Sequence, residues 1–135
     1  MSILEQGIEG EKLARLILKD KFKVDNIFQA DWIVLKNGKY YVIEVKHKQL
    51  FKSPPFDGQG LDIRQVNARI KFYKDTGIRC LFLVMDKDTG KVYWQWLDVL
   101  EYTEHFTTRN NIRIYNITKF IDIKISEEMS HKFVS

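Results

Sequence analysis

The chain has 135 residues, of which 44% are hydrophobic and 30% charged, a profile that suits one globular domain with one core. No apolar run approaches the length of a membrane span and no signal peptide opens the chain, so we expect an intracellular, cytoplasmic protein without a membrane partner. A single cysteine, Cys80, excludes an intrachain disulfide, and the three histidines stand at no ligand spacing from it, which argues against a cysteine–histidine zinc site.

The net charge of +4 is unevenly spread along the chain. Eight lysine or arginine residues and three aspartates lie from Lys46 to Arg79, so this segment carries +5 and the rest carries −1. A basic segment suits a polyanionic substrate such as nucleic acid. Many soluble domains are mildly basic, so charge alone does not identify a nucleic-acid-binding protein.

The first predicted element is a helix from about Ile3 to Lys21. It opens on a capping box, Ser2 to Glu5. On a helical wheel one side is apolar, and Glu11 falls inside it. That side comprises Leu4, Ile8, Ala14 and Leu18. We therefore expect Glu11 to point toward the interior, either as a functional acid or as an acid at the edge of the apolar side.

A strand is predicted from Phe22 to Phe28, and a hairpin that turns at Asn37-Gly38 follows it. This dipeptide between two β-branched and aromatic runs is typical of a two-residue type I′ turn, which fixes the register of the two strands. The register places Asp31 opposite Glu44. Lys46, two residues after Glu44, points to the same side of the sheet.

Two directly opposed carboxylates repel each other by roughly 3–4 kcal/mol at about 4.5 Å and an effective dielectric of about 20. A divalent cation would offset this repulsion, and hard oxygen ligands suit Mg²⁺ or Mn²⁺. The neighbouring lysine would also help. The alternative is a solvated edge hairpin with two unrelated acids. The apolar neighbours Val42, Ile43 and Val45 disfavour it, because they predict a buried strand and a buried acid needs a partner.

Residues 49–60 read as a loop, since they contain Pro54-Pro55 and two glycines. Two phenylalanines in this loop, Phe51 and Phe56, have two possible roles. They either stack on or wedge between exposed bases, or pack down to anchor the loop.

A second helix is predicted from Asp62 as N-cap to Gly77. Its apolar stripe consists of Ile63, Val66, Ile70 and Tyr73. Gln65 and Arg69, one turn apart, flank this stripe.

The remaining elements are expected to be strands. They are Arg79–Met85, Val92–Leu97 after a turn at 88–90, Ile112–Ile117 and Phe120–Ile125, with residues 126–135 as a flexible tail. The predicted order is helix, three strands, helix, strand and C-terminal strands. We therefore expect an α/β fold in which helices flank a mixed sheet, in one domain spanning residues 1–125.

These residues in this order resemble the PD-(D/E)XK nucleases, the restriction-endonuclease-like superfamily. Its hallmark is an acid at the start of the second strand and Glu-x-Lys on the third, matched here by Asp31 and Glu44-Val45-Lys46. Gly7 to Glu11 matches the Gly-x-x-x-Glu pattern of many first helices, and Gln65 matches a common glutamine on the next helix.

The similarity covers roughly the first 85 residues and is greatest to the small archaeal and phage Holliday junction resolvases. Ala30 departs from the proline that many members have before the acid, and the chain after Leu100 matches no pattern of the family.

This resemblance implies a restriction-endonuclease-like core and a magnesium-dependent homodimer, with Mn²⁺ as a substitute, that cuts four-way or other branched DNA in a phage or archaeal host. Glu11, Asp31 and Glu44 would hold the metal together with the backbone carbonyl of Val45. Lys46 would orient or activate the attacking water, and Gln65 would hydrogen-bond the site or a phosphate. The expected DNA contacts are Lys48, Lys52, Arg64 and Arg69.

Other interpretations stay open. Lys46 on its own suits a plain salt bridge to Glu44 or Asp31, and Gln65 suits a solvent-facing helix position. The whole chain also suits another nuclease of the superfamily, such as a nicking, flap, restriction-type or recombination nuclease. Two further alternatives are a non-catalytic DNA-binding domain and an interaction protein unrelated to nucleic acid. Both are less compatible with an opposed acid pair.

Overall fold

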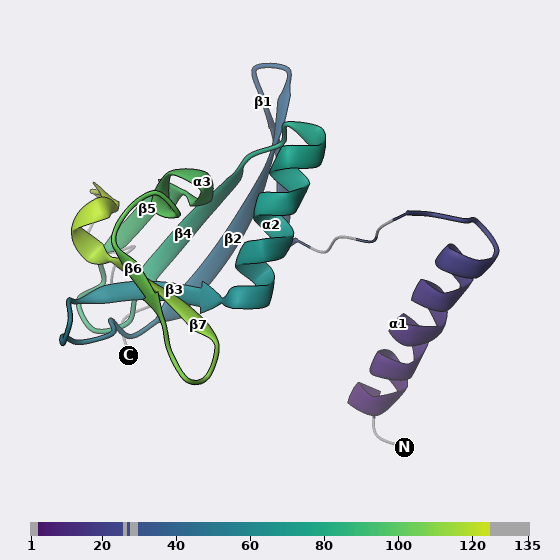
Figure 1. The fold of residues 1–135 in the computed structure, drawn as a ribbon, viewed down its shortest axis with the longest axis horizontal. Coiled ribbons are helices and arrows are strands. Elements are labelled where there is room, and N and C mark those ends of the chain that lie inside the picture. Colours follow the sequence, from purple (N-terminus) through teal and green to yellow (C-terminus); the bar gives the residue numbers. More distant parts are fainter. Residues whose placement is uncertain (1–2, 26, 28–29, 125–135) are drawn as a thin grey trace.

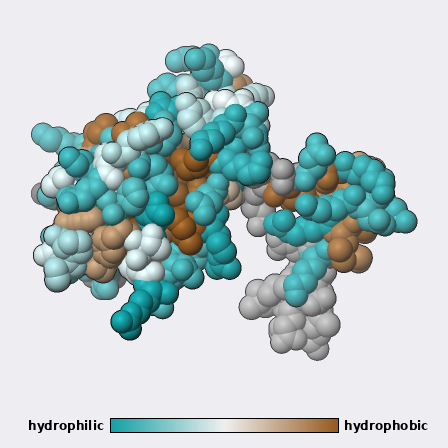
Figure 2. Space-filling model, in the orientation of Figure 1, coloured by the Kyte–Doolittle hydropathy of each residue, from teal (hydrophilic) through white to brown (hydrophobic). Residues whose placement is uncertain are grey.

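The computed structural model describes residues 3–25, 27 and 30–124. Helix α1 (Ile3–Asp20) stands apart from the rest of the molecule (Figure 1). In the space-filling view the helix carries hydrophobic surface among hydrophilic atoms (Figure 2). Leu13, Leu16 and Ile17 are exposed. Of the predicted apolar side, Ala14 and Leu18 are exposed as well, so the expectation that this side packs into the interior is wrong for these two residues. The side chains of Leu4 and Ile8 lie outside what the structure describes.

The larger sheet has the strand order β1-β2-β4-β5-β8. Strands β2 and β4 are parallel and all other neighbours are antiparallel, so the sheet is mixed. The strands are β1 (Trp32–Lys36), β2 (Lys39–Lys48), β4 (Cys80–Asp86), β5 (Val92–Trp96) and β8 (Ile121–Ile123). The predicted α/β class with a mixed sheet flanked by helices is confirmed.

A smaller antiparallel sheet has the order β3-β7-β6. Its strands are β3 (Gly58–Asp62), β7 (Ile112–Asn116) and β6 (His105–Thr107). Strand β3 lies so close to β7 that a Cβ on Gly60 would come within 2.3 Å of the Arg113 carbonyl oxygen. Glycine is therefore required at this position by the close approach of two backbones.

Helix α2 (Ile63–Thr76) begins and ends where the sequence predicts. The Asp62 side chain accepts a hydrogen bond from the Arg64 amide, and Gly77 ends the helix with φ of 78°. A short helix α3 (Leu97–Leu100) and a 3₁₀ turn η1 (Ile117–Lys119) complete the described elements. No described helix is both long enough and apolar enough to span a membrane.

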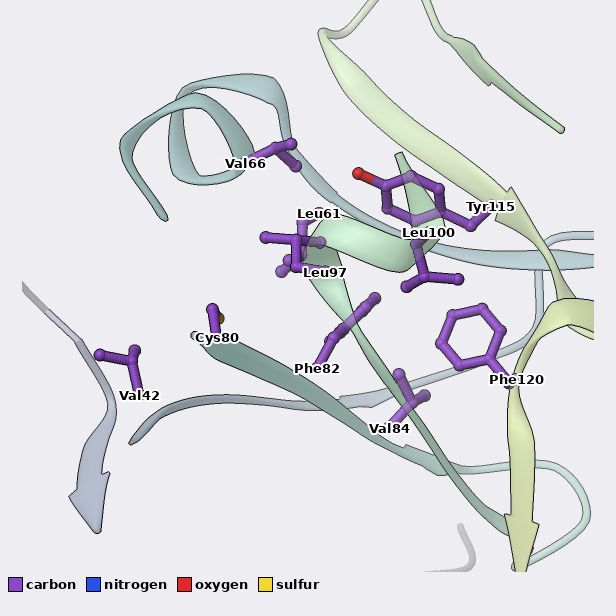
Figure 3. Packing of buried hydrophobic residues seen from close by; sticks show 10 residues of the cluster. All are labelled: Val42, Leu61, Val66, Cys80, Phe82, Val84, Leu97, Leu100, Tyr115 and Phe120. Atoms are coloured by element: carbon purple, nitrogen blue, oxygen red, sulfur yellow. The ribbon is translucent and has the colours of Figure 1, made fainter. Parts of the chain in front are cut away.

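The hydrophobic core lies between the larger sheet and the layer formed by α2, α3 and the smaller sheet (Figure 3). It comprises Val42, Leu61, Val66, Cys80, Phe82, Val84, Leu97, Leu100, Tyr115 and Phe120. The single cysteine, Cys80, is 3% exposed and belongs to this core.

Three sequence expectations need correction. The described residues of the predicted strand Phe22–Phe28 form no strand; they belong to the segment that joins α1 to β1. The predicted loop 49–60 ends in the first residues of β3. Of the two roles left open for its phenylalanines, the structure shows inward packing: the ring centroids of Phe51 and Phe56 lie 5.3 and 5.4 Å from that of Phe106. Strand β6 and helix α3 were not predicted. The expected tail lies outside the described residues.

Candidate active site

The β1–β2 hairpin has the register that its turn dipeptide predicts. Asn37 and Gly38 have φ of 51° and 76°, and the paired residues run from Trp32 opposite Ile43 to Lys36 opposite Lys39. Asp31 directly precedes β1, so continuation of this register brings it opposite Glu44. The Val45 amide confirms this approach, because it donates a 3.0 Å hydrogen bond to Oδ2 of Asp31.

Glu44 is a buried carboxylate with one satisfied and one unsatisfied oxygen. Its side chain is 1% exposed, and its Oε1 accepts a 2.5 Å hydrogen bond from Nε of Arg69, which is 6% exposed. No described residue hydrogen-bonds to its buried Oε2. A buried carboxylate oxygen without a donor is costly unless a cation or another donor meets it. This oxygen therefore fits a metal ligand.

The pKa of Glu44 is raised above the ordinary glutamate value. Burial is the main cause, because it disfavours the charged form. The hydrogen bond and the charge of Arg69 act in the opposite direction, while the nearby charge of Asp31 adds to the rise. The charge of Asp31 thus acts on Glu44, as the hairpin register requires.

Two lysines follow Glu44 on the same side of β2, Lys46 and Lys48. Burial lowers the pKa of Lys48, and the positive charge of Lys46 lowers it further, whereas Asp62 opposes the shift. The Lys48 ammonium donates a 3.3 Å hydrogen bond to the Gly60 carbonyl. The row of Glu44, Lys46 and Lys48 therefore leads from the acid pair toward the junction of β3 and α2.

Asp62 is a site residue that sequence reasoning treated only as a helix cap. Hydrogen bonds from Arg64 lower the pKa of Asp62, and the charge of Lys46 lowers it as well, so the aspartate lies near that lysine. Arg64 donates from Nε and Nη2 to the two carboxylate oxygens, at 3.1 Å each. A useful sequence signal was the position of Asp62 at the start of the helix that carries the predicted glutamine.

A cavity of about 1270 Å³ joins the two acids to α2. Its polar lining residues are Arg15, Asp31, Glu44, Asp62, Arg64, Gln65 and Arg69. Gln65 is half-buried in this wall. The cavity brings together carboxylates, an amide and guanidinium groups, which is a suitable set for binding a phosphate with a cation.

The remaining predicted residues lie in different situations. Glu11 is in α1, but its side chain lies outside what the structure describes. Lys52 is exposed in the loop before β3. Among the described side chains, no group of three or more histidines, cysteines or acids is arranged to hold a metal. Asp31 and Glu44 form a pair, and a third carboxylate ligand would have to come from elsewhere.

The chain is similar in fold to solved structures. No family model and no curated protein matches the chain. Among solved structures, the chain is similar to Hjc of Archaeoglobus fulgidus, a Holliday junction resolvase from an archaeal hyperthermophile. The match covers 94% of this chain and 99% of that chain, with 16% sequence identity and a TM-score of 0.47. The side chains of the present protein, rather than this match, carry the functional proposal.

Proposed function

We propose that this protein is a magnesium-dependent endonuclease that hydrolyses phosphodiester bonds in branched DNA, with the four-way junction as its substrate. The observation that carries the proposal is the pairing of Asp31 with a buried Glu44 whose Oε2 has no described partner, followed on the same side of β2 by Lys46. A DNA-binding domain without catalysis would gain nothing from two opposed carboxylates, whose repulsion costs stability.

Asp31 and Glu44 would hold the metal, joined by Glu11 and by the backbone carbonyl of Val45. Mg²⁺, or Mn²⁺ in its place, would lower the pKa of a bound water and neutralise charge on the phosphate. Arg69 would keep Glu44 in place through Oε1 and leave Oε2 for the cation.

Lys46 would orient the attacking water or stabilise the developing oxyanion, a role that suits a compact ammonium group beside a carboxylate. Gln65, in the cavity wall, would donate a hydrogen bond to a phosphate oxygen. These two side chains would therefore act on the substrate, whereas the acids act on the metal.

Four basic residues would bind the DNA backbone: Lys48, Lys52, Arg64 and Arg69. Arg64 suits this role best, because its side chain is 87% exposed and borders the cavity. Lys52 is exposed on the neighbouring loop. Arg69 donates its Nε to Glu44, so a phosphate contact by this residue would come from its two Nη groups.

A four-way junction needs two symmetric cuts, and a two-fold dimer supplies two active sites in the required relation. We therefore propose a homodimer as the active form. A nicking, flap, restriction-type or recombination nuclease built on the same site is the second candidate, because the acid pair and Lys46 serve any phosphodiester hydrolysis.

Labelled DNA substrates separate these candidates. A mobile four-way junction, a flap, a nicked duplex and a linear duplex would each be incubated with the protein, with and without Mg²⁺. We expect paired symmetric cuts on the junction that require the metal and are lost in Glu44→Gln. Cutting of the flap or linear duplex instead would favour the second candidate. Binding to DNA at low salt without any cutting in Mg²⁺ or Mn²⁺ would refute a nuclease.

A further inference from the structure

The β1–β2 hairpin projects past the body of the larger sheet (Figure 1). Strand β4 starts at Cys80, opposite Val42, so no described strand pairs with the residues of β2 before Val42 on that side. Exposure rises sharply at this point, because Val42 is 2% exposed whereas Tyr40 is 56% exposed. Residues 35–40, which we call the hairpin tip, therefore stand clear of the core.

The hairpin tip carries an exposed apolar pair on the same side as the two acids. Leu35 lies directly opposite Tyr40 in the register. Because alternate residues of a strand face the same side, this pair faces the side of Asp31 and Glu44. Ile33 lies between the pair and the acids and lines their cavity. Tyr40 precedes Glu44 by four positions, which places the pair about 13 Å from the acids along the strand.

The hairpin tip is also basic. Lys36 ends β1 and Lys39 begins β2, so the two lysines flank the turn. Both are exposed, and neither forms an ion pair with a described residue. The chain from Trp32 to Ile43 contains these two lysines and no acid. Exposed apolar side chains beside unpaired cations suit a polyanion with flat apolar faces, which is what the phosphates and bases of a nucleic acid supply.

The base of the hairpin and its tip have different surroundings. Arg15 of α1 lines the cavity together with Asp31 and Ile33, at the base of the hairpin. An approach of α1 there, which the proposed role of Glu11 requires, is compatible with a tip that binds another molecule. Continuity with the cavity places that molecule next to the acids, as a DNA substrate would be.

We propose that the hairpin tip enters the branch point of the DNA, where Leu35 and Tyr40 pack against the faces of base pairs and Lys36 and Lys39 bind the flanking phosphates. The strands part at a branch point, so inserting an apolar side chain there costs less unstacking than within a continuous duplex. The inference rests on the proposed function, since it names the part of the branched substrate that the same site recognises.

Binding of matched DNAs tests the apolar pair. The double variant Leu35→Thr/Tyr40→Thr removes the large side chains, and threonine keeps the strand preference of the hairpin. Both this variant and its parent carry Glu44→Gln, so that the DNA stays uncut. We expect the double variant to lose about tenfold in affinity for a four-way junction and less than about twofold for a linear duplex. Tyr102→Thr, at a position 94% exposed, is the control and should bind both DNAs as the parent does.

A 2-aminopurine base at the branch point of an immobile junction reports insertion directly. We expect its fluorescence to change on binding of the parent, and the same base placed well inside one arm to give no change. The double variant should abolish the change at the branch point, and circular dichroism checks that it is folded. No change with the parent, or a change that the double variant retains, would overturn the inference. So would equal losses of affinity for junction and duplex.

The two lysines give an independent readout. Lys36→Ala/Lys39→Ala should reduce the slope of log affinity against log salt for the junction by about two, because two phosphate contacts are lost. An unchanged slope would contradict their role. Failure of the unmodified protein to cut any DNA in Mg²⁺ would refute the nuclease, yet these binding measurements would still decide whether the tip recognises a branch point. Normal cutting with unchanged junction affinity in the tip variants would overturn the role of the tip alone.

Discussion

At the scale of single residues, Glu44 joins the sequence pattern to the chemistry. The pattern predicted that it faces Asp31 and lies on a buried strand, and both features are present. The ion pair with Arg69 was not predicted, because it depends on how α2 packs against β2 rather than on any local spacing. The positions of Gln65 and Arg69 beside the apolar stripe of α2 were the only hint that this helix faces the acids.

Lys46→Ala should lower the rate of DNA cleavage by about 10²–10⁴-fold while leaving metal binding intact, because the lysine would act on water or oxyanion rather than on the cation. Lys91→Ala, at an exposed position just before β5, is the matched control. Single-turnover cleavage and calorimetry measure the two properties. Equal losses in both variants would show that only general positive charge matters.

The thiol of Cys80 should be unreactive in the folded protein. Burial is the main cause that raises its pKa to about 12, and the nearby charge of Glu44 adds to it. At about pH 8 only about one thiol in ten thousand would be ionised. We expect a disulfide reagent to label this cysteine after unfolding in urea but not before. Rapid labelling of the native protein would show that the core between β4 and α2 opens readily.

At the scale of elements, the local signals were reliable where they were strong. Asn37-Gly38 set the hairpin, Asp62 and Gly77 set the ends of α2, and β4 followed from its apolar run. Strand β3 was not predicted because Gly58-Gln59-Gly60 contains no β-branched or aromatic side chain. It is a strand because it pairs with β7 at a distance that admits only glycine at 58 and 60.

The attachment of α2 to β2 should depend on the buried ion pair. Arg69→Met leaves the Glu44 charge buried without its partner, and we expect a loss of about 3–5 kcal/mol in the free energy of unfolding, measured in urea. The double variant Glu44→Gln/Arg69→Met should lose less than the sum of the two single losses. Strict additivity would mean that the pair does not couple the two elements.

The loss in Arg69→Met should also depend on pH in a defined direction. The folded-state pKa of Glu44 is already raised, and removing Arg69 takes away the main influence that lowers it. The folded state then binds a proton more tightly than the unfolded chain does. The loss should therefore shrink as the pH falls through that raised pKa toward the ordinary glutamate value. A loss that grows on acidification would contradict this assignment.

Gly60→Ala should weaken the contact between β3 and β7. The added Cβ would meet the Arg113 backbone, which cannot move away as a flexible side chain would, so we expect a cost of about 1–3 kcal/mol in thermal or urea unfolding. Gly38→Ala provides the comparison. Its Cβ meets nothing within 4 Å, and its cost comes only from the positive φ. A smaller loss at Gly60 than at Gly38 would contradict the close packing of the two strands.

At the scale of the whole molecule, the sequence predicted the α/β class and the acid pair but not the arrangement of layers. The α/β class and the acid pair could be predicted because they depend on short segments whose periodicity and turn residues act locally. The position of α1 depends instead on contacts between distant segments. Phe22 illustrates the difference: it was assigned to a strand because of its β propensity, yet it is exposed in the segment that joins α1 to β1.

In the proposed site, the hairpin brings Asp31 and Glu44 to one shared cation. Calorimetric titration with Mn²⁺ tests it most directly on the unmodified protein, Asp31→Asn, Glu44→Gln and the exposed control Asp88→Asn. We predict that the unmodified protein and the control bind the ion alike, and that each of the other two variants loses more than about tenfold in affinity. An unmodified protein that binds no Mn²⁺, or an Asp31→Asn variant that binds it unchanged, would contradict the shared site.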